Sequence, residues 1–396
     1  MSCSKKIIFI SEYLYPSDSS TSYYLTNIVE VLAENRELLV VTTTGLNGAK
    51  ELSFLQGRIH RLKSSLLDKN RAFSRAIKLL LSSFRIMGCI FSLLNKNDAV
   101  FAVTNPAFIV LFLGVLKKVK PFHYTLLVYD VFPENIVGAK LLGNNNLLYK
   151  LLKKIFDWSY GQADSLIVIG RDMDEIIQQK VCGTVETCLI PNWCDVSLVT
   201  PSLKENNEII QKFRIENKFV CAFTGNLGRV QGIDNLLEAA SLVKNDDFIL
   251  LFIGDGAMRP SIEEHISKKS NSNVLYAGQY PAKYQDIFLN ACDVAIVSLA
   301  ASMYGLGVPS KSYYNMAAGK PLLYIGDKNS EIAQVIQEHD IGWVVPPENP
   351  NELALVFEAA CEDKSLNLKG LKSRNVVEEK YSKQVVLNKY HALYKS

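Results

Sequence analysis

Three closely spaced glycines follow an apolar run in the second half of the sequence. The segment FTGNLGRVQGIDNLLEA (223–239) passes from a strand-like run to a helix-like pattern, and Gly225, Gly228 and Gly232 lie between them. A strand that turns on glycines into a helix brings free backbone N–H groups and the positive helix end to one point. This pattern predicts a phosphate-binding turn; a tight turn that binds nothing is the alternative.

A lysine at a second helix start lies further along the chain. In VPSKSYYNMAAGKP (308–321), Pro309 fits the first helical position or a neighbouring one, and the closing Gly-Lys-Pro ends the helix. Ser310 and Lys311 are therefore expected in the first turn, where N–H groups and a cation can together face a diphosphate. A solvated lysine is the alternative.

Carboxylates mark candidate positions in the first half. Asp130 closes the apolar run HYTLLVYD, so its side chain is expected beyond the carboxyl end of a strand, where parallel sheets bind ligands. His123 lies at the opposite end of that run and is predicted to pack. Asp172 and Asp174 form an Asp-x-Asp pair that opens a helical pattern, and we interpret them as helix-capping acids rather than as manganese ligands.

The elements that position these residues are buried parallel strands alternating with helices. Continuous apolar runs indicate strands covered on both faces, and hence a doubly wound sheet. Polar and proline residues interrupt the pattern near 190–207. We therefore predict an α/β protein with two Rossmann-like domains, residues 1–197 and 203–375, with a C-terminal helix over about 376–396 that packs back on the first domain. The strand-like runs are 5–11, 37–43, 98–104, 123–130, 165–170, 218–225, 248–256, 293–299 and 320–326.

Several classes of site are excluded by what the sequence lacks. The first apolar run leads into SEYLYPSDSSTSYYL (11–25), which has no glycine where a dinucleotide-binding domain carries G-x-G-x-x-G. The P-loop pattern is missing as well. The eight cysteines include no C-x-x-C pair. We therefore expect neither a metal site nor a cofactor.

Basic residues are concentrated in one part of the first half. Residues 69–120 hold nine lysines and arginines and a single acid, Asp98, although the formal net charge of the chain is only +3. A helix over 71–86 with bases beside an apolar stripe would suit an anionic membrane surface, and an ordinary solvated face is the alternative. The most apolar runs, 79–94 and 106–116, are shorter than the ~20 residues that a membrane span needs. We expect a cytoplasmic protein, peripheral on the membrane through 69–120, without nucleic acid as partner.

At these residues the sequence resembles glycosyltransferase family 4, retaining enzymes of the GT-B fold, in its bacterial exopolysaccharide, O-antigen and colanic-acid variety. The resemblance covers nearly the full chain and is strongest over 219–350. The matching elements are GNLGRVQGID from Gly225, the Gly-Asp-Gly turn at 254–256, VPSK from Val308, MAAGKP from Met316 and DVFPE from Asp130.

The resemblance implies two Rossmann-like domains that face a cleft, the first for the acceptor and the second for the nucleotide-sugar donor. It implies transfer of a hexose, with UDP-glucose as the best guess, to a saccharide or polyprenyl-diphosphate-linked acceptor, without a metal. The implied donor-binding residues are Gly225, Asn226, Gly228, Arg229, Gln231, Gly254, Gly278, Tyr280, Ser310, Lys311, Tyr314 and Glu331.

The sequence departs from the wider family at several of these positions. Asn226 and Gln231 stand where most members have an arginine and a lysine, as they do in the bacterial variety. Leu306 and Tyr314 replace two glutamates, the second of which usually holds the nucleotide ribose. Arg229, Lys311 and backbone amides are left to meet the diphosphate, and Glu331 is expected to contact a sugar or ribose hydroxyl.

In the first domain the resemblance implies an acceptor site. Asp130 is a candidate to activate the acceptor hydroxyl or to hold a donor hydroxyl, with Glu134 behind it; helix capping is the alternative. Ser19, Ser20 and Thr21 occupy the first loop, where they contact a phosphate or acceptor, or cap a helix. A nucleotide-sugar sensor without turnover and a UDP-sugar epimerase on the same fold are the alternative functions.

Overall fold

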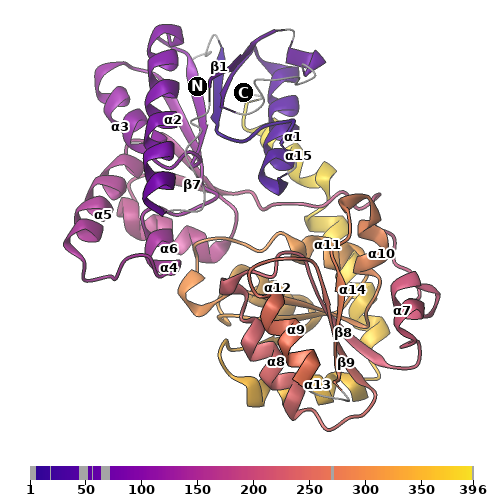
Figure 1. The fold of residues 1–396 in the computed structure, drawn as a ribbon. Coiled ribbons are helices and arrows are strands. Elements are labelled where there is room, and N and C mark those ends of the chain that lie inside the picture. Colours follow the sequence, from indigo (N-terminus) through magenta and orange to yellow (C-terminus); the bar gives the residue numbers. More distant parts are fainter. Residues whose placement is uncertain are drawn as a thin grey trace. The chain divides into compact units, whose positions relative to one another are not determined.

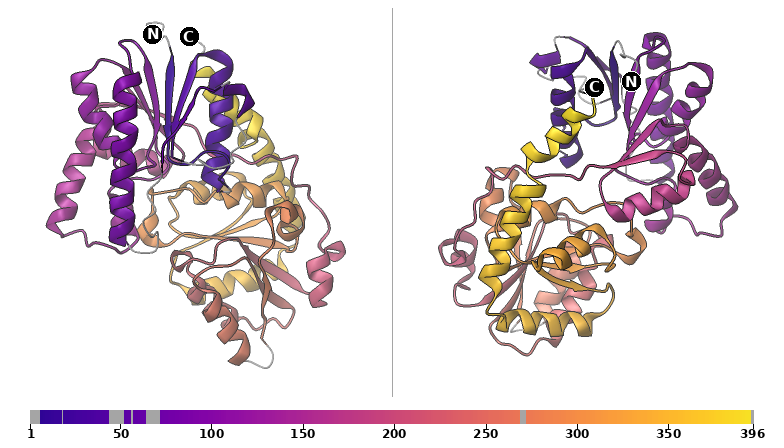
Figure 2. Two further views of the ribbon diagram at one scale, coloured as in Figure 1. Left: turned by 45° about the horizontal axis from the view of Figure 1, so that its top comes forward. Right: turned by 180° about the vertical axis from the view of Figure 1, so that it is seen from behind.

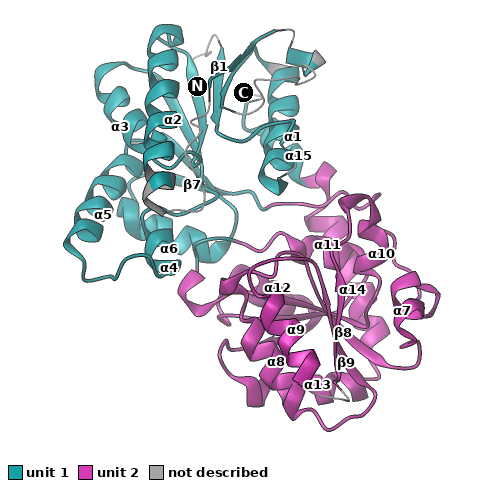
Figure 3. Ribbon diagram, viewed as in Figure 1, with its two compact units in different colours: residues 1–191, 305–307, 386–396 teal, residues 192–304, 308–385 magenta. Residues whose placement is uncertain are grey.

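The computed structural model divides the chain into two compact units (Figures 1 and 3). Unit 1 comprises residues 1–191, 305–307 and 386–396, and unit 2 comprises residues 192–304 and 308–385. Each unit contains one sheet with helices on both faces (Figure 2). The structure describes residues 6–17, 19–43, 52–55, 57–63, 72–268 and 272–394.

Unit 1 contains a parallel sheet in the order β3-β2-β1-β4-β5-β6-β7. Ile7 of β1 pairs with Leu38 of β2 on one side and with Ala99 of β4 on the other. The strand order therefore reverses beside β1, and such switch points are where doubly wound sheets bind ligands. The strands are β1 (Ile7–Ser11), β2 (Leu38–Thr42), β3 (Ile59–Arg61), β4 (Ala99–Val103), β5 (His123–Leu127), β6 (Ser165–Val168) and β7 (Glu186–Leu189).

The helices of unit 1 lie on both sides of this sheet, with α2, α3 and α5 on one side and α1 and α15 on the other (Figures 1 and 2). Every residue of β1 and β4 is buried between them. No helix in the described part of the chain is long and apolar enough to cross a bilayer. The helices are α1 (Ser20–Asn35), α2 (Ala72–Leu93), α3 (Ile109–Val119), α4 (Glu134–Gly138), α5 (Leu147–Tyr160), α6 (Arg171–Val181) and α15 (Lys383–Ala392), with the short η1 (Ser53–Leu55).

Unit 2 repeats the same parallel topology in the order β10-β9-β8-β11-β12-β13. Alternate residues of β8 enter two separate apolar clusters: Val220 and Ala222 join one, and Cys221 and Phe223 join the other. Burial on both faces explains why its sequence is an unbroken apolar run. The strands are β8 (Phe219–Thr224), β9 (Phe248–Ile253), β10 (Val274–Gly278), β11 (Val294–Ser298), β12 (Leu322–Ile325) and β13 (Gly342–Val345).

The helices of unit 2 connect these strands, and α11 and α12 begin at the expected donor residues Lys311 and Glu331. The α-helices are α7 (Glu208–Phe213), α8 (Ile233–Leu242), α9 (Arg259–Lys268), α10 (Gln285–Leu289), α11 (Lys311–Ala317), α12 (Glu331–His339), α13 (Pro350–Glu362) and α14 (Leu366–Lys380). The 3-10 turns are η2 (Lys204–Asn206), η3 (Arg229–Gln231), η4 (Ala282–Tyr284) and η5 (Ala301–Met303).

The structure confirms the α/β class and the two doubly wound sheets, and all nine apolar runs contain a strand. Four strands, β3, β7, β10 and β13, lie outside those runs, and all four are edge strands. Their residues are mostly half-buried or exposed. Polar residues interrupt β3 and β7, whereas β10 and β13 are short apolar segments that were not predicted as strands. An apolar-run criterion identifies only strands that are covered on both faces.

Candidate functional site

The turns after β8 and β9 meet backbone to backbone. A Cβ atom on Gly254, whose φ is +145°, would lie 1.8 Å from the carbonyl oxygen of Gly225. The Gly225 N–H donates to the carbonyl of Ile253 (2.8 Å), and the Gly254 N–H donates to the carbonyl of Gly278 (2.9 Å). Gly225 and Gly278 also have positive φ values, +106° and +85°. Glycine is required at Gly254 because no side chain fits between the two turns.

A cavity of about 360 Å³ opens beside these turns, wholly within unit 2. Its size lies in the range of small-molecule sites. Four of the expected donor residues line it, namely Gly225, Asn226, Gly254 and Tyr280. The other lining residues, which the sequence analysis missed, are Ile253, Asp255, Gln279 and Phe288. Asp255 could have been predicted, since it lies inside the Gly-Asp-Gly turn.

Lys311 begins α11, and its side chain meets Phe223 of β8 and Gln231 of η3. The Nζ atom lies 3.6 Å from the ring centroid of Phe223 and donates to Oε1 of Gln231 (3.4 Å). Burial of the ammonium group lowers the pKa of Lys311 to about 7. In the described part of the chain no carboxylate lies within 4.0 Å of this nitrogen. When protonated, the lysine is therefore a cation held among neutral groups.

The start of α11 differs by about two residues from the expectation. Pro309 precedes the helix, Ser310 is the N-cap with φ of −59°, and Lys311 is the first helical residue. The Ser310 side chain makes no capping hydrogen bond. The Pro309 carbonyl instead accepts from the Ser312 N–H (3.1 Å), so a turn precedes the helix. Ser310 and Lys311 still lie at the helix start.

The remaining donor candidates lie on η3, α11 and α12. Arg229 is exposed and opens η3, and a Cβ on Gly228 would come within 3.0 Å of the Asn226 side chain. Tyr314 follows Lys311 on α11, where it is half-buried against the core. Glu331 begins α12, and only 3% of it is exposed.

In unit 1, two asparagine amides hold Asp130. Asn105, which follows β4, donates to Asp130 Oδ2 (3.2 Å), and Asn135 of α4 donates to Oδ1 (3.0 Å). The backbone N–H of Asp130 donates to Oγ1 of Thr104 (3.1 Å). The carboxylate therefore sits at the carboxyl ends of β4 and β5, oriented by side chains from both turns.

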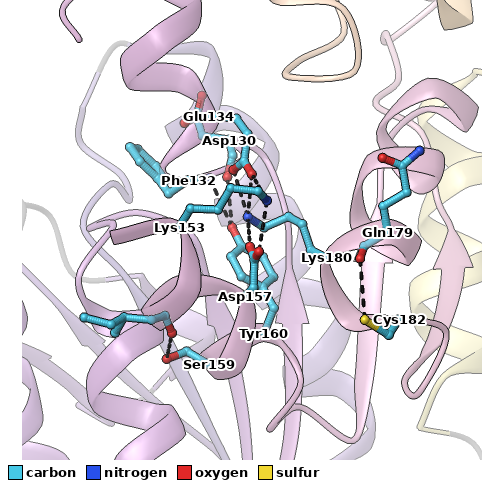
Figure 4. A network of polar contacts seen from close by, with 11 residues as sticks. Asp130, Phe132, Glu134, Lys153, Asp157, Ser159, Tyr160, Gln179, Lys180 and Cys182 are labelled. Carbon is cyan, nitrogen blue, oxygen red and sulfur yellow. Dashed lines mark hydrogen bonds and ion pairs between the residues drawn. The ribbon is translucent and has the colours of Figure 1, made fainter. Parts of the chain in front are cut away.

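Glu134 lies in a cluster of two carboxylates and two lysines, shown in Figure 4. Its carboxylate accepts from Lys180 of α6 and from Lys153 of α5, both at 2.8 Å, and Asp157 pairs with the same two lysines. Burial alone raises the pKa of Glu134, but the charges of Lys180 and Lys153 lower it, and the net pKa lies below the usual value. Both carboxylate oxygens of Glu134 thus have partners within unit 1.

The first loop of unit 1 starts α1. Ser19 is the N-cap, and its Oγ accepts from the Ser22 N–H (3.1 Å), which is the capping alternative. Ser20 is exposed and Thr21 is half-buried in the first turn.

His123 and the Asp172/Asp174 pair interact with residues close to them in their own parts of unit 1. His123 Nδ1 lies 3.6 Å from Asp164 at the amino end of β5. Asp172 and Asp174 lie in the first turn of α6, and Asp172 Oδ1 accepts from the Met173 N–H (2.9 Å). Among the described residues, no cluster of three His, Cys, Asp or Glu side chains has metal-binding geometry.

Comparison with known proteins places the chain among glycosyltransferases. The family model of glycosyl transferases group 1 matches residues 205–382. The probable glycosyltransferase WbjE of Pseudomonas aeruginosa is 36% identical over 390 residues, which cover 98% of this chain and 97% of that protein. The putative colanic acid biosynthesis glycosyl transferase WcaI of Escherichia coli K12 is 20% identical over 65% of each chain.

Solved structures share the fold of the whole chain. Sucrose-phosphate synthase from Thermosynechococcus elongatus superimposes with a TM-score of 0.74 at 17% identity and covers 99% of this chain and 98% of its own. The glycosyltransferase WaaG, involved in lipopolysaccharide biosynthesis, gives a TM-score of 0.69 at 14% identity, with 98% and 100% covered. Two Rossmann-like units, the family match and the nearly full-length similarity to WbjE together show that the chain belongs to the group 1 glycosyltransferases and has the GT-B fold.

Proposed function

We propose that this protein transfers a hexose from a UDP-sugar, with UDP-glucose as the first candidate, to a saccharide or polyprenyl-diphosphate-linked acceptor in polysaccharide biosynthesis. The names of its relatives support the pathway, since WcaI is assigned to colanic acid biosynthesis. Anabaena HepE, which has the same fold at 13% identity, has been crystallised with UDP and with UDP-glucose. Those complexes support a UDP-sugar as the first donor to test.

The position of Lys311 is the observation that carries the proposal. Its Nζ lies at a helix start, beside the glycine turn, against Phe223 and Gln231. A buried cation without a carboxylate is costly, and a bound diphosphate would supply the missing negative charge. We assign Lys311, with Arg229 and the N–H groups of the turn, to the diphosphate.

The cavity beside the turns suits the nucleoside. Tyr280 and Phe288 offer aromatic surfaces for a planar base, and Asn226, Asp255 and Gln279 offer hydrogen-bonding groups. A pocket with apolar walls and a few polar groups is typical of small-molecule sites. In this proposal the base and ribose occupy the cavity while the diphosphate extends toward Lys311.

The proposed reaction breaks the bond between the anomeric carbon and the diphosphate oxygen. The bonding electrons go to the diphosphate, the acceptor oxygen bonds to the anomeric carbon with retained configuration, and the acceptor proton passes to the leaving diphosphate. Negative charge grows on the diphosphate while the sugar gains oxocarbenium character. We propose that Lys311 and the helix starts stabilise this charge without a metal.

For Asp130 we propose a role in holding a sugar hydroxyl. Each of its oxygens accepts one amide N–H, and an ionised carboxylate is an acceptor to which a sugar hydroxyl can donate. The two asparagines fix the orientation of the carboxylate. Glu134, which is occupied by Lys153 and Lys180, is proposed to position this loop rather than to touch substrate.

The test is calorimetric titration of UDP and UDP-glucose, without added metal, into wild-type protein and a Lys311→Gln variant. We expect Lys311→Gln to weaken UDP binding by about tenfold or more, because a hydrogen bond to a charged group contributes ~1.5–3 kcal/mol. Lys364→Gln, an exposed lysine of unit 2 outside the site, is the matched control and should bind like wild type.

Proton uptake makes the test sharper. The pKa of Lys311 is about 7 in the free protein, and a bound diphosphate should raise it, so binding near pH 8 should take up protons. Titrations in two buffers with different ionisation enthalpies measure that uptake, and Lys311→Gln should abolish it. Unchanged UDP affinity in Lys311→Gln would remove Lys311 from the diphosphate site. Release of UDP from UDP-glucose in the presence of an acceptor would establish turnover, and donor binding without release would favour a sensor.

A further inference from the structure

Exposed apolar side chains are concentrated on three neighbouring helices of unit 1. Helix α3 contacts both α2 and α5, and the three lie together along one side of the unit (Figures 1 and 2). About half of the large apolar side chains that are exposed in the described residues belong to these helices. Exposed apolar side chains concentrated on neighbouring helices of a folded protein are characteristic of binding surfaces.

Helix α5 is apolar on its outer side as well as on its packed side. Tyr149, Phe156, Ser159 and Tyr160 are buried against the unit. The outward stripe repeats every three or four residues and is formed by Leu147, Leu148, Leu151, Ile155 and Trp158, with Leu147 83% exposed. The spacing keeps these side chains on one helical face. That face has no partner among the described residues.

Helices α2 and α3, which pack against each other, also expose apolar side chains. On α2, Ile77, Phe84 and Phe91 are exposed at helical spacing, and Phe84 is 67% exposed. On α3, Val115 and Val119 lie one turn apart and are both exposed. We call the exposed side chains of α2, α3 and α5 the outer helical face.

The charge on the outer helical face is positive. The three helices contain one acid, Asp157, which is paired with Lys153 and Lys180. The exposed bases beside the apolar stripes are Arg85, Lys118, Lys150 and Lys154. Apolar side chains flanked by bases, with no free acid, match the composition of surfaces that lie on anionic lipid.

We propose that the outer helical face binds the surface of an anionic lipid membrane, with the apolar stripes entering the headgroup region and the bases meeting lipid phosphates. A second copy of this chain fits the face poorly, because a two-fold interface would set its bases against each other. The expected membrane contact through 69–120 is thereby extended to α5, while residues 69–71 lie outside the described residues. The inference does not depend on the donor, since it concerns unit 1 alone.

The test is co-sedimentation of the whole protein with vesicles of phosphatidylcholine alone or with phosphatidylglycerol added. We expect binding to the anionic vesicles that weakens as salt is raised. The triple variant Lys118→Gln, Lys150→Gln, Lys154→Gln should lose about fivefold in affinity for each lysine removed. The variant Leu148→Gln, Leu151→Gln, Ile155→Gln should also lose binding, whereas Leu355→Gln, Leu371→Gln, on equally exposed residues of unit 2, should not.

Trp158 gives a direct optical readout. The chain has three tryptophans, of which Trp158 is exposed and Trp193 is fully buried. Anionic vesicles should shift the emission to the blue, brominated lipids should quench it, and both effects should vanish in Trp158→Phe. Failure to bind either vesicle, or variants that bind like wild type, would overturn the proposal. Sedimentation velocity provides a second way to overturn it. If the wild type were a dimer and the variant Leu148→Gln, Leu151→Gln, Ile155→Gln were a monomer, the outer helical face would be a protein interface.

Discussion

The turns after β8 and β9 in unit 2 and the turn after β5 in unit 1 are held by different kinds of interaction. In unit 2, Gly225 and Gly254 meet through their backbones, and a Cβ atom on Gly254 would fall 1.8 Å from a carbonyl oxygen. In unit 1, Asp130 and Glu134 are held by side chains from other elements, including Asn105 and Lys180. Both turns lie at the carboxyl ends of parallel strands.

Backbone contacts and side-chain contacts are expected to differ in how well they tolerate substitution. Backbone contacts cannot relax without moving a strand or a helix, so a new atom between two turns strains the whole sheet edge. Side-chain ion pairs can partly rearrange, and water can reach the carboxylates of Glu134 and Asp157, which are 15% and 24% exposed. We therefore expect the turns of unit 2 to be less tolerant of substitution.

The largest effect is expected for Gly254→Ala. The added Cβ would collide with the Gly225 carbonyl at a φ of +145°, where side chains are strained, so we expect a loss of about 4 kcal/mol in the free energy of unfolding. Urea unfolding and UDP titration measure the two consequences, stability and donor binding. Gly143→Ala is the control, since an added Cβ meets nothing within 4 Å. Equal unfolding midpoints for the two variants would contradict the expectation that the backbone contact at Gly254 excludes a side chain.

A smaller loss is expected for Lys180→Met. Its ammonium group is almost fully buried between Glu134 and Asp157, and its removal leaves two carboxylates with one cation, at a cost of about 2–3 kcal/mol. Lys154→Met, on an exposed lysine of α5, should change the unfolding free energy by less than about 0.5 kcal/mol.

The pH dependence of stability tests whether the loss in Lys180→Met comes from charge pairing. The folded-state pKa of Glu134 is lowered, so its stabilising contribution is present above the unfolded-state pKa of ~4.5 and is lost as the pH falls through the folded-state value. The difference between wild type and Lys180→Met should therefore narrow below about pH 4.5. A difference that stays constant into acid would assign the loss to packing instead of charge.

The smallest effect, and one of opposite sign, is expected for Lys311→Met in the absence of donor. The pKa of Lys311 is about 7 when folded, against 10.5 for an unperturbed lysine, so the unfolded chain binds more protons between these values and stability rises with pH across that window. Lys311→Met should be more stable than wild type by about 1–2 kcal/mol below pH 7, and the gain should disappear toward pH 10. Thermal unfolding at pH 6 and pH 9.5 measures it, and a destabilised variant at pH 6 would show that the buried cation is not strained.

The local sequence pattern was sufficient to predict the central strands and the turns that follow them. Strands buried on both faces leave continuous apolar runs, and the glycines at Gly225 and Gly254 mark positions where the backbone has positive φ. The edge strands β3, β7, β10 and β13 were not predicted, because β3 and β7 contain polar residues and β10 and β13 are short and only partly buried. The start of α11 was misplaced by about two residues, since Pro309 belongs to the preceding turn.

Contacts between distant residues could not be predicted in the same way. Gln231 and Lys311 are 80 residues apart, and Glu134 and Lys180 are 46 apart. The second pair joins the start of α4 to the last turn of α6, and the first pair forms because parallel strands carry their following turns to one edge of a sheet. Gln279 and Phe288 enter the donor cavity for the same reason, although nothing in their own neighbourhood distinguishes them.

By itself the sequence determined the fold class, the strand-turn-helix units and the family, because periodicity, glycine sterics and short motifs act over a few residues at a time. Only the tertiary structure decided that Lys311 lies over Phe223, that Glu134 is bound by Lys153 and Lys180, and that α5 leaves an apolar face uncovered. The physical reason is that burial and charge pairing depend on which elements pack together, and that packing is set by strand order across the whole sheet.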